Sequence, residues 1–88
     1  MRVTVQLFAR LRELAGRSDT TCEVAPGASV ADVWQTLERA HPAIAPLRSA
    51  VSAAVNAEFA AMTTTVHEGD DIAFLPPVSG GAGVSRSS

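Results

Sequence analysis

Apolar and polar residues alternate at the beginning of the chain. In residues 2–8, RVTVQLF, the side chains of Val3, Val5 and Leu7 fall on one side and those between them are polar. A period of two residues is typical of a strand with one buried face. Further short stretches of small, β-branched or aromatic residues predict strands at 20–25, 51–56 and 72–75.

A different period marks the clearest helix, which begins at Ser29. Apolar residues then recur every three or four positions, at Val30, Val33, Leu37 and Ala40. This spacing gives a helix a single apolar face. The Ser29 hydroxyl can accept hydrogen bonds from the first turn, and Asp32 three residues later completes a capping box. We expect the helix to end before Pro42, because the residue before a proline disfavours helical geometry.

The remaining segments predict connections between these elements. Residues 9–15 favour a short helical turn closed by Gly16, whereas 43–50 and 57–71 have the composition of loops. We expect the first two strands to form a hairpin and the strand at 51–56 to be central. The order strand-strand-helix-strand-strand predicts an α+β fold, in which one main helix packs on a mixed sheet of four or five strands.

Size and composition limit what the chain can do alone. It has 88 residues, of which 47% are hydrophobic and 18% charged, enough for one domain with one core. A deep enclosed active site is difficult to build in so small a body. These values therefore favour a carrier, an adaptor or a subunit over a self-sufficient enzyme.

The charges argue against several classes of partner. Seven basic and nine acidic residues give a net charge of -2, and lysine is absent, so the chain cannot form Lys-linked polymers of itself. The arginines are scattered and few aromatic residues are available for stacking, so we expect no nucleic-acid binding. No apolar stretch approaches the roughly 20 residues that span a bilayer, and the N-terminus lacks the apolar segment of a signal peptide. We expect a cytoplasmic protein with no membrane partner.

Few side chains offer chemistry of their own. Cys22 is the only cysteine, and we expect it to be a small buried residue rather than a reactive thiol. His41 and His67 are isolated and expected at the surface, and Trp34 is expected to pack beside the apolar stripe. No cluster has the spacing of metal ligands or of a catalytic triad, so we expect no metal site and no bound cofactor.

The composition changes at the end of the chain, where residues 78–88 are VSGGAGVSRSS. Small, polar and glycine-rich segments favour a flexible tail, and Pro76-Pro77 end the last strand by removing two backbone donors. Gly80 and Gly81 have no Cβ atoms, so they can pass through a channel that is too narrow for other residues. By composition alone, a frayed end without function is the simpler interpretation.

Four segments resemble the small subunits of molybdopterin synthases. They are VQLFARLRELAG at 5–16, AVNAEF at 54–59, HEGDDIAF at 67–74 and IAFLPPVSGG at 72–81. The octet FLPPVSGG after an acidic turn is the most specific part of this resemblance. It implies a β-grasp (ubiquitin-like) domain at 1–78, a reactive diglycine tail at 79–81 and a C-terminal extension at 82–88.

The resemblance also implies a sulfur carrier in the biosynthesis of molybdopterin, the molybdenum cofactor. In such carriers an activating enzyme uses ATP and Mg to adenylate the C-terminal glycine carboxylate, here that of Gly81, and a sulfur donor converts the adenylate to a thiocarboxylate. The tail then enters the large synthase subunit, in a heterotetramer of two small and two large subunits, and delivers sulfur to the pterin precursor. The chain would be the non-catalytic, sulfur-donating subunit.

A partner-binding surface is expected where the tail leaves the domain. It would comprise Phe59, Met62, Phe74, Leu75, Pro76, Pro77, Val78 and Ser79. Phe74 and Leu75 are neighbours in one strand and cannot face the same side, so one of them is expected on the exposed face. Apolar side chains on such a face commonly mark a protein interface, although packing in the core is the alternative for each.

Seven residues follow Gly81 and leave it with an amide in place of a free carboxylate. We therefore expect a protease to cut after Gly81. Three other functions remain open. The chain could carry sulfur for thiamine, cysteine or tRNA thiolation; it could be a ubiquitin-like modifier joined through Gly81 to lysines of other proteins; or it could be a β-grasp interaction module with an inert tail.

Overall fold

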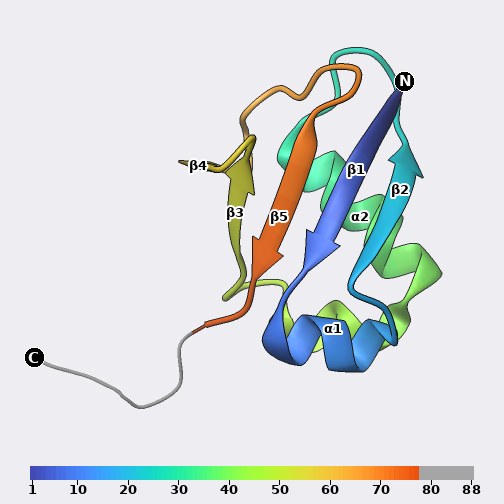
Figure 1. Cartoon of the computed structure of the whole chain (residues 1–88), viewed down its shortest axis with the longest axis vertical. Coiled ribbons are helices and arrows are strands. Elements are labelled where there is room, and N and C mark those ends of the chain that lie inside the picture. Colours follow the sequence, from blue (N-terminus) through green and yellow to red (C-terminus); the bar gives the residue numbers. More distant parts are fainter. Residues whose placement is uncertain (78–88) are drawn as a thin grey trace, which may run out of the picture.

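The structure, a computed structural model, describes residues 1–77, and its centre is a five-stranded sheet (Figure 1). The strands are β1 (Arg2–Leu7), β2 (Asp19–Glu23), β3 (Ser52–Val55), β4 (Glu58–Ala60) and β5 (Asp71–Leu75). Their order is β2-β1-β5-β3-β4, with β1 parallel to β5 and the other neighbours antiparallel. The helical segments are α1 (Ala9–Ala15), α2 (Val30–Ala40) and the 3-10 helix η1 (Pro42–Leu47). The predicted mixed sheet with one main helix is confirmed.

The N-terminal half follows the alternation in the sequence. Val3, Val5 and Leu7 of β1 are buried, and the residues between them lie on the opposite face of the sheet. β1 and β2 are antiparallel neighbours, with Val3 opposite Cys22, but α1 connects them in place of a tight hairpin turn. α1 ends at Gly16, whose φ of 76° places it in the left-handed region that glycine adopts without strain.

The beginning of α2 is fixed by the predicted capping box. The backbone N–H of Asp32 donates to Ser29 Oγ at 3.3 Å, and the backbone N–H of Ser29 donates to Asp32 Oδ2 at 2.9 Å. α2 lies across one face of the sheet, behind the strands in Figure 1. Its buried residues are Val30, Val33, Trp34 and Leu37.

Ala40, in contrast, is exposed, so its place in the predicted apolar stripe was wrong. Successive helical residues turn by 100°, which puts Trp34 nearer the middle of the buried face than Ala40. The predicted packing role of Trp34 is confirmed: its ring meets that of Phe74 edge to face, with centroids 5.1 Å apart. The Trp34 Nε1–H donates to Glu38 Oε1 at 2.9 Å, so this buried polar group is satisfied.

A hairpin that the sequence did not predict forms between β3 and β4. Residues 57–71 were expected to be a loop, but Glu58–Ala60 pairs with β3 as an edge strand. Asn56 and Ala57 connect the two strands with φ angles of 51° and 73°, which corresponds to a two-residue turn of the primed kind. β3 is therefore an inner strand as expected, but β5 occupies the middle of the sheet.

Candidate functional site

The last strand brings the end of the domain to one end of the sheet. β5 runs parallel to β1, so its last residue, Leu75, lies at the same end of the sheet as α1 (Figure 1). Pro76 is half-buried and Pro77 is exposed, directly after β5. Four predicted site residues, Val78, Ser79, Gly80 and Gly81, lie outside the described residues. The site is therefore built from the end of β5 and the surfaces around it.

Phe74 is a core residue and not part of a surface in this structure. It is fully buried, lies opposite Leu7 in the parallel register and contacts Trp34. Its expected role in partner binding is corrected for this reason, since its ring cannot reach a partner without leaving the core. The neighbouring Leu75 is half-buried and points to the other face of the sheet.

The face of the sheet opposite α2 carries a row of apolar residues, which we call the open face. The registers place Phe59, Ala54 and Ala73 beside one another across β4, β3 and β5. Phe59 is 82% exposed, the largest exposure among the large hydrophobic residues of the described part. Leu75 follows Ala73 on the same side of β5, at the point where the strand ends. Ala54 is buried and Ala73 and Leu75 are half-buried, so Phe59 is the most exposed member of this row. Exposed apolar side chains on such a face are common at protein interfaces.

Phe8 adds to the open face, and sequence reasoning missed it. It follows Leu7 with extended backbone angles, so its side chain points away from the core, and it is 42% exposed. The parallel register of β1 and β5, continued by one residue, places Phe8 opposite Leu75. The alternation of side chains along the first strand could have predicted this, because the residue after the buried Leu7 faces the opposite side. Ala54 and Ala73 could not be found without the strand registers.

Met62 belongs to a different part of the surface. Its side chain is half-buried and packs against the core. Its carbonyl accepts a hydrogen bond of 2.8 Å from the backbone N–H of Ala31, near the beginning of α2. Met62 thus holds the loop after β4 against the helix. Phe59, in contrast, lies on the open face opposite Ala54, so the two predicted partner-binding residues have different surroundings.

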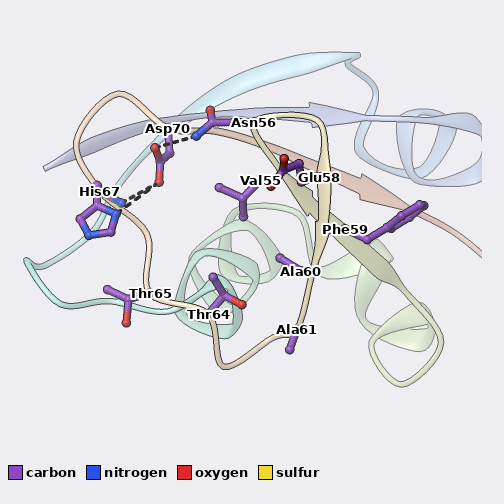
Figure 2. Close-up of a pocket in the computed structure, with 10 residues that line it drawn as sticks. All are labelled: Val55, Asn56, Glu58, Phe59, Ala60, Ala61, Thr64, Thr65, His67 and Asp70. Carbon is purple, nitrogen blue, oxygen red and sulfur yellow. Dashed lines mark hydrogen bonds and ion pairs between the residues drawn. The ribbon is translucent and has the colours of Figure 1, made fainter.

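A shallow groove of about 600 Å³ lies between the β3–β4 hairpin and the segment 64–70 (Figure 2). Its most connected polar group is Asp70, which accepts from Asn56 Nδ2 at 3.0 Å and from the backbone N–H of His67 at 2.8 Å. These hydrogen bonds, that from Asn56 first, lower the pKa of Asp70. The backbone N–H of Asp71 in turn donates to Asn56 Oδ1 at 3.0 Å. The polar groups of the groove thus stabilise two turns, and Phe59 projects away from them.

The remaining predicted roles concern isolated side chains. Cys22 is buried, as expected, and this burial raises the pKa of its thiol. The side chain of His67 is exposed, and His41 is half-buried at the end of α2. In residues 1–77 no three His, Cys, Asp or Glu side chains are close enough to share a metal ion. None of the helices described is long and apolar enough to cross a membrane.

Comparison with known proteins identifies the family. The sequence profile of the ThiS family matches residues 5–81, so the match includes both glycines of the pair and ends on the second. The chain belongs to the ThiS family. The family membership inferred from the four sequence segments is thereby confirmed.

Several proteins that are similar to this ThiS-family chain are named for their function. The molybdopterin synthase sulfur carrier subunit of Arabidopsis thaliana is 35% identical over 81 residues, which cover 92% of this chain and 84% of the relative. The crystal structure of SAMP1 from Haloferax volcanii superimposes with a TM-score of 0.84 at 32% identity, covering 92% of this chain and all of that one. A chain in a protein–protein complex of subunits 1 and 2 of molybdopterin-converting factor from Helicobacter pylori 26695 shares the fold, with a TM-score of 0.65 at 20% identity and 92% of this chain covered. The predicted ubiquitin-like β-grasp fold is confirmed.

Proposed function

We propose that this chain is a sulfur carrier of molybdopterin biosynthesis that carries sulfur as a thiocarboxylate on Gly81. The observation that carries the proposal is the extent of the family match, which ends on Gly81, seven residues before Ser88. Relatives that match nearly the whole chain are named as carriers of this pathway. In residues 1–77 we assign roles in the core and in partner binding, and we place the reactive group at the end of the chain, on Gly81.

The chemistry requires a free carboxylate. Hydrolysis of the Gly81–Ala82 peptide bond adds one water and releases residues 82–88. The new carboxylate attacks the α-phosphate of ATP, and pyrophosphate leaves. A donor of sulfide-level sulfur (HS⁻) then attacks the acyl carbon, AMP leaves with the electron pair of the broken C–O bond, and loss of the S–H proton gives the thiocarboxylate. Adenylation supplies the good leaving group that a carboxylate lacks, which divides one difficult substitution into two easier ones.

The open face is the surface that we assign to partner binding. Phe8, Phe59 and Leu75 supply its large apolar side chains, and the small residues Ala54 and Ala73 between them keep it flat. Its border is polar: Gln6 Nε2 donates to Asp71 Oδ2 at 3.1 Å beside Ala73. An apolar centre within a polar rim is the usual arrangement of a protein interface. The partners would be the large synthase subunit, two copies each in a heterotetramer, and the activating enzyme, which binds ATP and Mg itself.

Protein modification is the second candidate, and one comparison favours it. A small archaeal modifier protein of Haloferax volcanii is 36% identical and is covered over 97% of its length. As a modifier, the chain would pass from the adenylate to a lysine amine of another protein, with AMP again leaving. The absence of lysine excludes self-linked chains through this amine, so single attachments are the expected product.

Mass spectrometry of three forms tests the proposal. The full chain, a chain that ends at Gly81 and the same short chain with Gly81→Ala are each incubated with activating enzyme, ATP, Mg and a sulfur donor. We expect only the unmodified short chain to exchange one oxygen for sulfur efficiently and to convert the pterin precursor with the large subunit. Sulfur transfer by a full chain that keeps Ser88 would refute the cleavage step. Protein adducts that survive reduction and boiling, without pterin conversion, would support the modifier.

A further inference from the structure

One row of side chains crosses all five strands on the open face, which is turned toward the viewer in Figure 1. The registers place Asp19 of β2 beside Gln6 of β1, and Gln6 beside Ala73 of β5. Ala54 and Phe59 continue the row across β3 and β4. The open face therefore has an apolar half over β5, β3 and β4 and a polar half over β1 and β2.

Asp71 lies where these two halves meet. It is the first residue of β5 and precedes Ala73 by two positions, so both side chains are on the open face. The parallel register places Asp71 beside Thr4 of β1. Asp71 is half-buried, and Gln6 Nε2 donates to its two carboxylate oxygens at 3.3 and 3.1 Å.

The domain itself provides no cation for this carboxylate. Arg2, on the same face, is paired with Glu23 at 2.9 Å. Among the ion pairs in the part of the chain that the structure describes, none includes Asp19 or Asp71. An ionised carboxylate offers about four acceptor sites, and one amide group donates to that of Asp71. Its other acceptor sites are left to solvent or to a partner.

A partner that covers the apolar half also covers Asp71. A standard interface removes about 800 Å² from each protein, which corresponds to a disc with a radius of roughly 16 Å. Two residues advance about 7 Å along a strand, and neighbouring strands lie about 4.8 Å apart. Asp71 is therefore well inside a disc centred on Ala73. Removing the water around its carboxylate is costly unless a cation replaces that water.

We propose that Asp71 selects a partner that places a lysine or arginine side chain against it, beside an apolar patch that covers Phe59 and Ala73. The inference rests on the proposed function, in which this partner is the large synthase subunit. Asp19 adds a second, more exposed negative charge across β1, so the cation lies above β1, between the two carboxylates. A neutral apolar surface would leave Asp71 covered and unpaired, and an acidic surface would be repelled, so the same residue discriminates against wrong partners.

Isosteric substitutions test the inference. Chains that end at Gly81 carry Asp71→Asn, Asp19→Asn or the control Asp32→Asn. Asp32 is in α2, on the other side of the sheet, and its replacement changes the net charge equally and leaves an oxygen that can accept the capping hydrogen bond. Trp34 fluorescence verifies that each variant is folded. Binding to the large subunit is then measured by calorimetry at low and at high salt.

We expect Asp71→Asn to raise the dissociation constant by roughly tenfold, and the effect to persist at high salt because the covered pair is shielded from ions. Asp19→Asn, at a more exposed position, should raise it by about twofold, at low salt only. Asp32→Asn should leave it unchanged. Thr4→Lys leaves Asp71 intact and places a cation beside it, so it should also weaken binding by roughly tenfold.

Several results would overturn the inference. Unchanged or tighter binding of Asp71→Asn would do so, because removing a carboxylate that faces no cation saves its cost of desolvation. Equal weakening by Asp71→Asn and Asp32→Asn would mean that only net charge matters, and unaltered binding of Thr4→Lys would leave no cation beside Asp71 in the complex. If the unmodified short chain does not bind the large subunit at any salt concentration, the proposed function itself fails. If it binds and transfers sulfur and Asp71→Asn matches it, only the inference about Asp71 fails.

Discussion

The turn between β3 and β4 contains an alanine, Ala57, in a backbone conformation that favours glycine. Ala57 has a φ of 73°, in the left-handed region where a Cβ atom approaches the following carbonyl oxygen. Two-residue hairpins of this kind favour Asn-Gly, and this chain has Asn56-Ala57. We predict that Ala57→Gly stabilises the protein, although glycine usually destabilises regular structure.

The size of the effect follows from two opposing terms. Removing the Cβ atom relieves about 1–2 kcal/mol of left-handed strain. The greater freedom of glycine in the unfolded chain costs about 0.4–1 kcal/mol. Ala57 is exposed, so no packing is lost. The expected net gain is roughly 0.5–1 kcal/mol, which corresponds to an increase of about 2–8 °C in the melting temperature of so small a domain.

Trp34 provides the measurement. It is the only tryptophan of the chain and is buried against Phe74, so its fluorescence reports unfolding in urea. Ala40→Gly is the matched control: Ala40 is also exposed, but it is the last residue of α2, so the same replacement should destabilise by at most about 0.5–1 kcal/mol, the cost of glycine in a helix interior. A loss of stability for both variants would show that the turn does not require left-handed geometry and would refute the reasoning.

Three further predictions concern the core, the open face and the turn at Asp70. Phe74→Leu should lower the free energy of unfolding by about 1–3 kcal/mol, measured by circular dichroism in urea. The folded fraction should bind the large subunit with unchanged affinity. A loss of affinity without a loss of stability would instead place Phe74 in the interface. Phe59→Ser should change stability by less than about 0.5 kcal/mol and weaken large-subunit binding by at least about tenfold in calorimetry, whereas unaltered binding would remove Phe59 from the interface. The hydrogen bonds from Asn56 and His67 lower the pKa of Asp70 in the folded chain, so its stabilisation is present above the unfolded value of about 3.9 and is lost as the pH falls through the folded value. Urea midpoints measured between neutral and acid pH should therefore fall less steeply for Asp70→Asn than for the unmodified chain, and identical slopes would contradict this role.

The features that the sequence predicted are those that local rules control. Alternation placed Val3, Val5 and Leu7 in the core because neighbours in a strand point to opposite faces. The capping box fixed the first residue of α2, since Ser29 and Asp32 satisfy backbone groups that no other part of the helix can reach. Such interactions connect residues only a few positions apart, so they are visible without the tertiary structure.

The features that escaped prediction depend on pairing between distant segments. β4 has three residues, and its turn lacks the glycine that would have marked a hairpin. The sequence does not decide whether Phe74 or Leu75 faces the core, because the parallel pairing with β1 determines which of the two meets α2. The open face likewise arises when Phe59, Ala54 and Ala73, from three strands, come into register. No single segment contains that information.

The placement of β5 explains how a chain with so few reactive side chains can take part in group transfer. Because β5 is the middle strand, it pairs with β1 up to Phe74 on one edge and with β3 up to Leu75 on the other. On the proposed function, a partner bound to the open face would hold the end of β5, and this position would limit where Gly81 can lie. An edge strand such as β4 would be held less firmly, because it pairs with a neighbouring strand on one side only. In the proposed reaction the fold would contribute positioning, and the partner proteins would supply the catalytic groups.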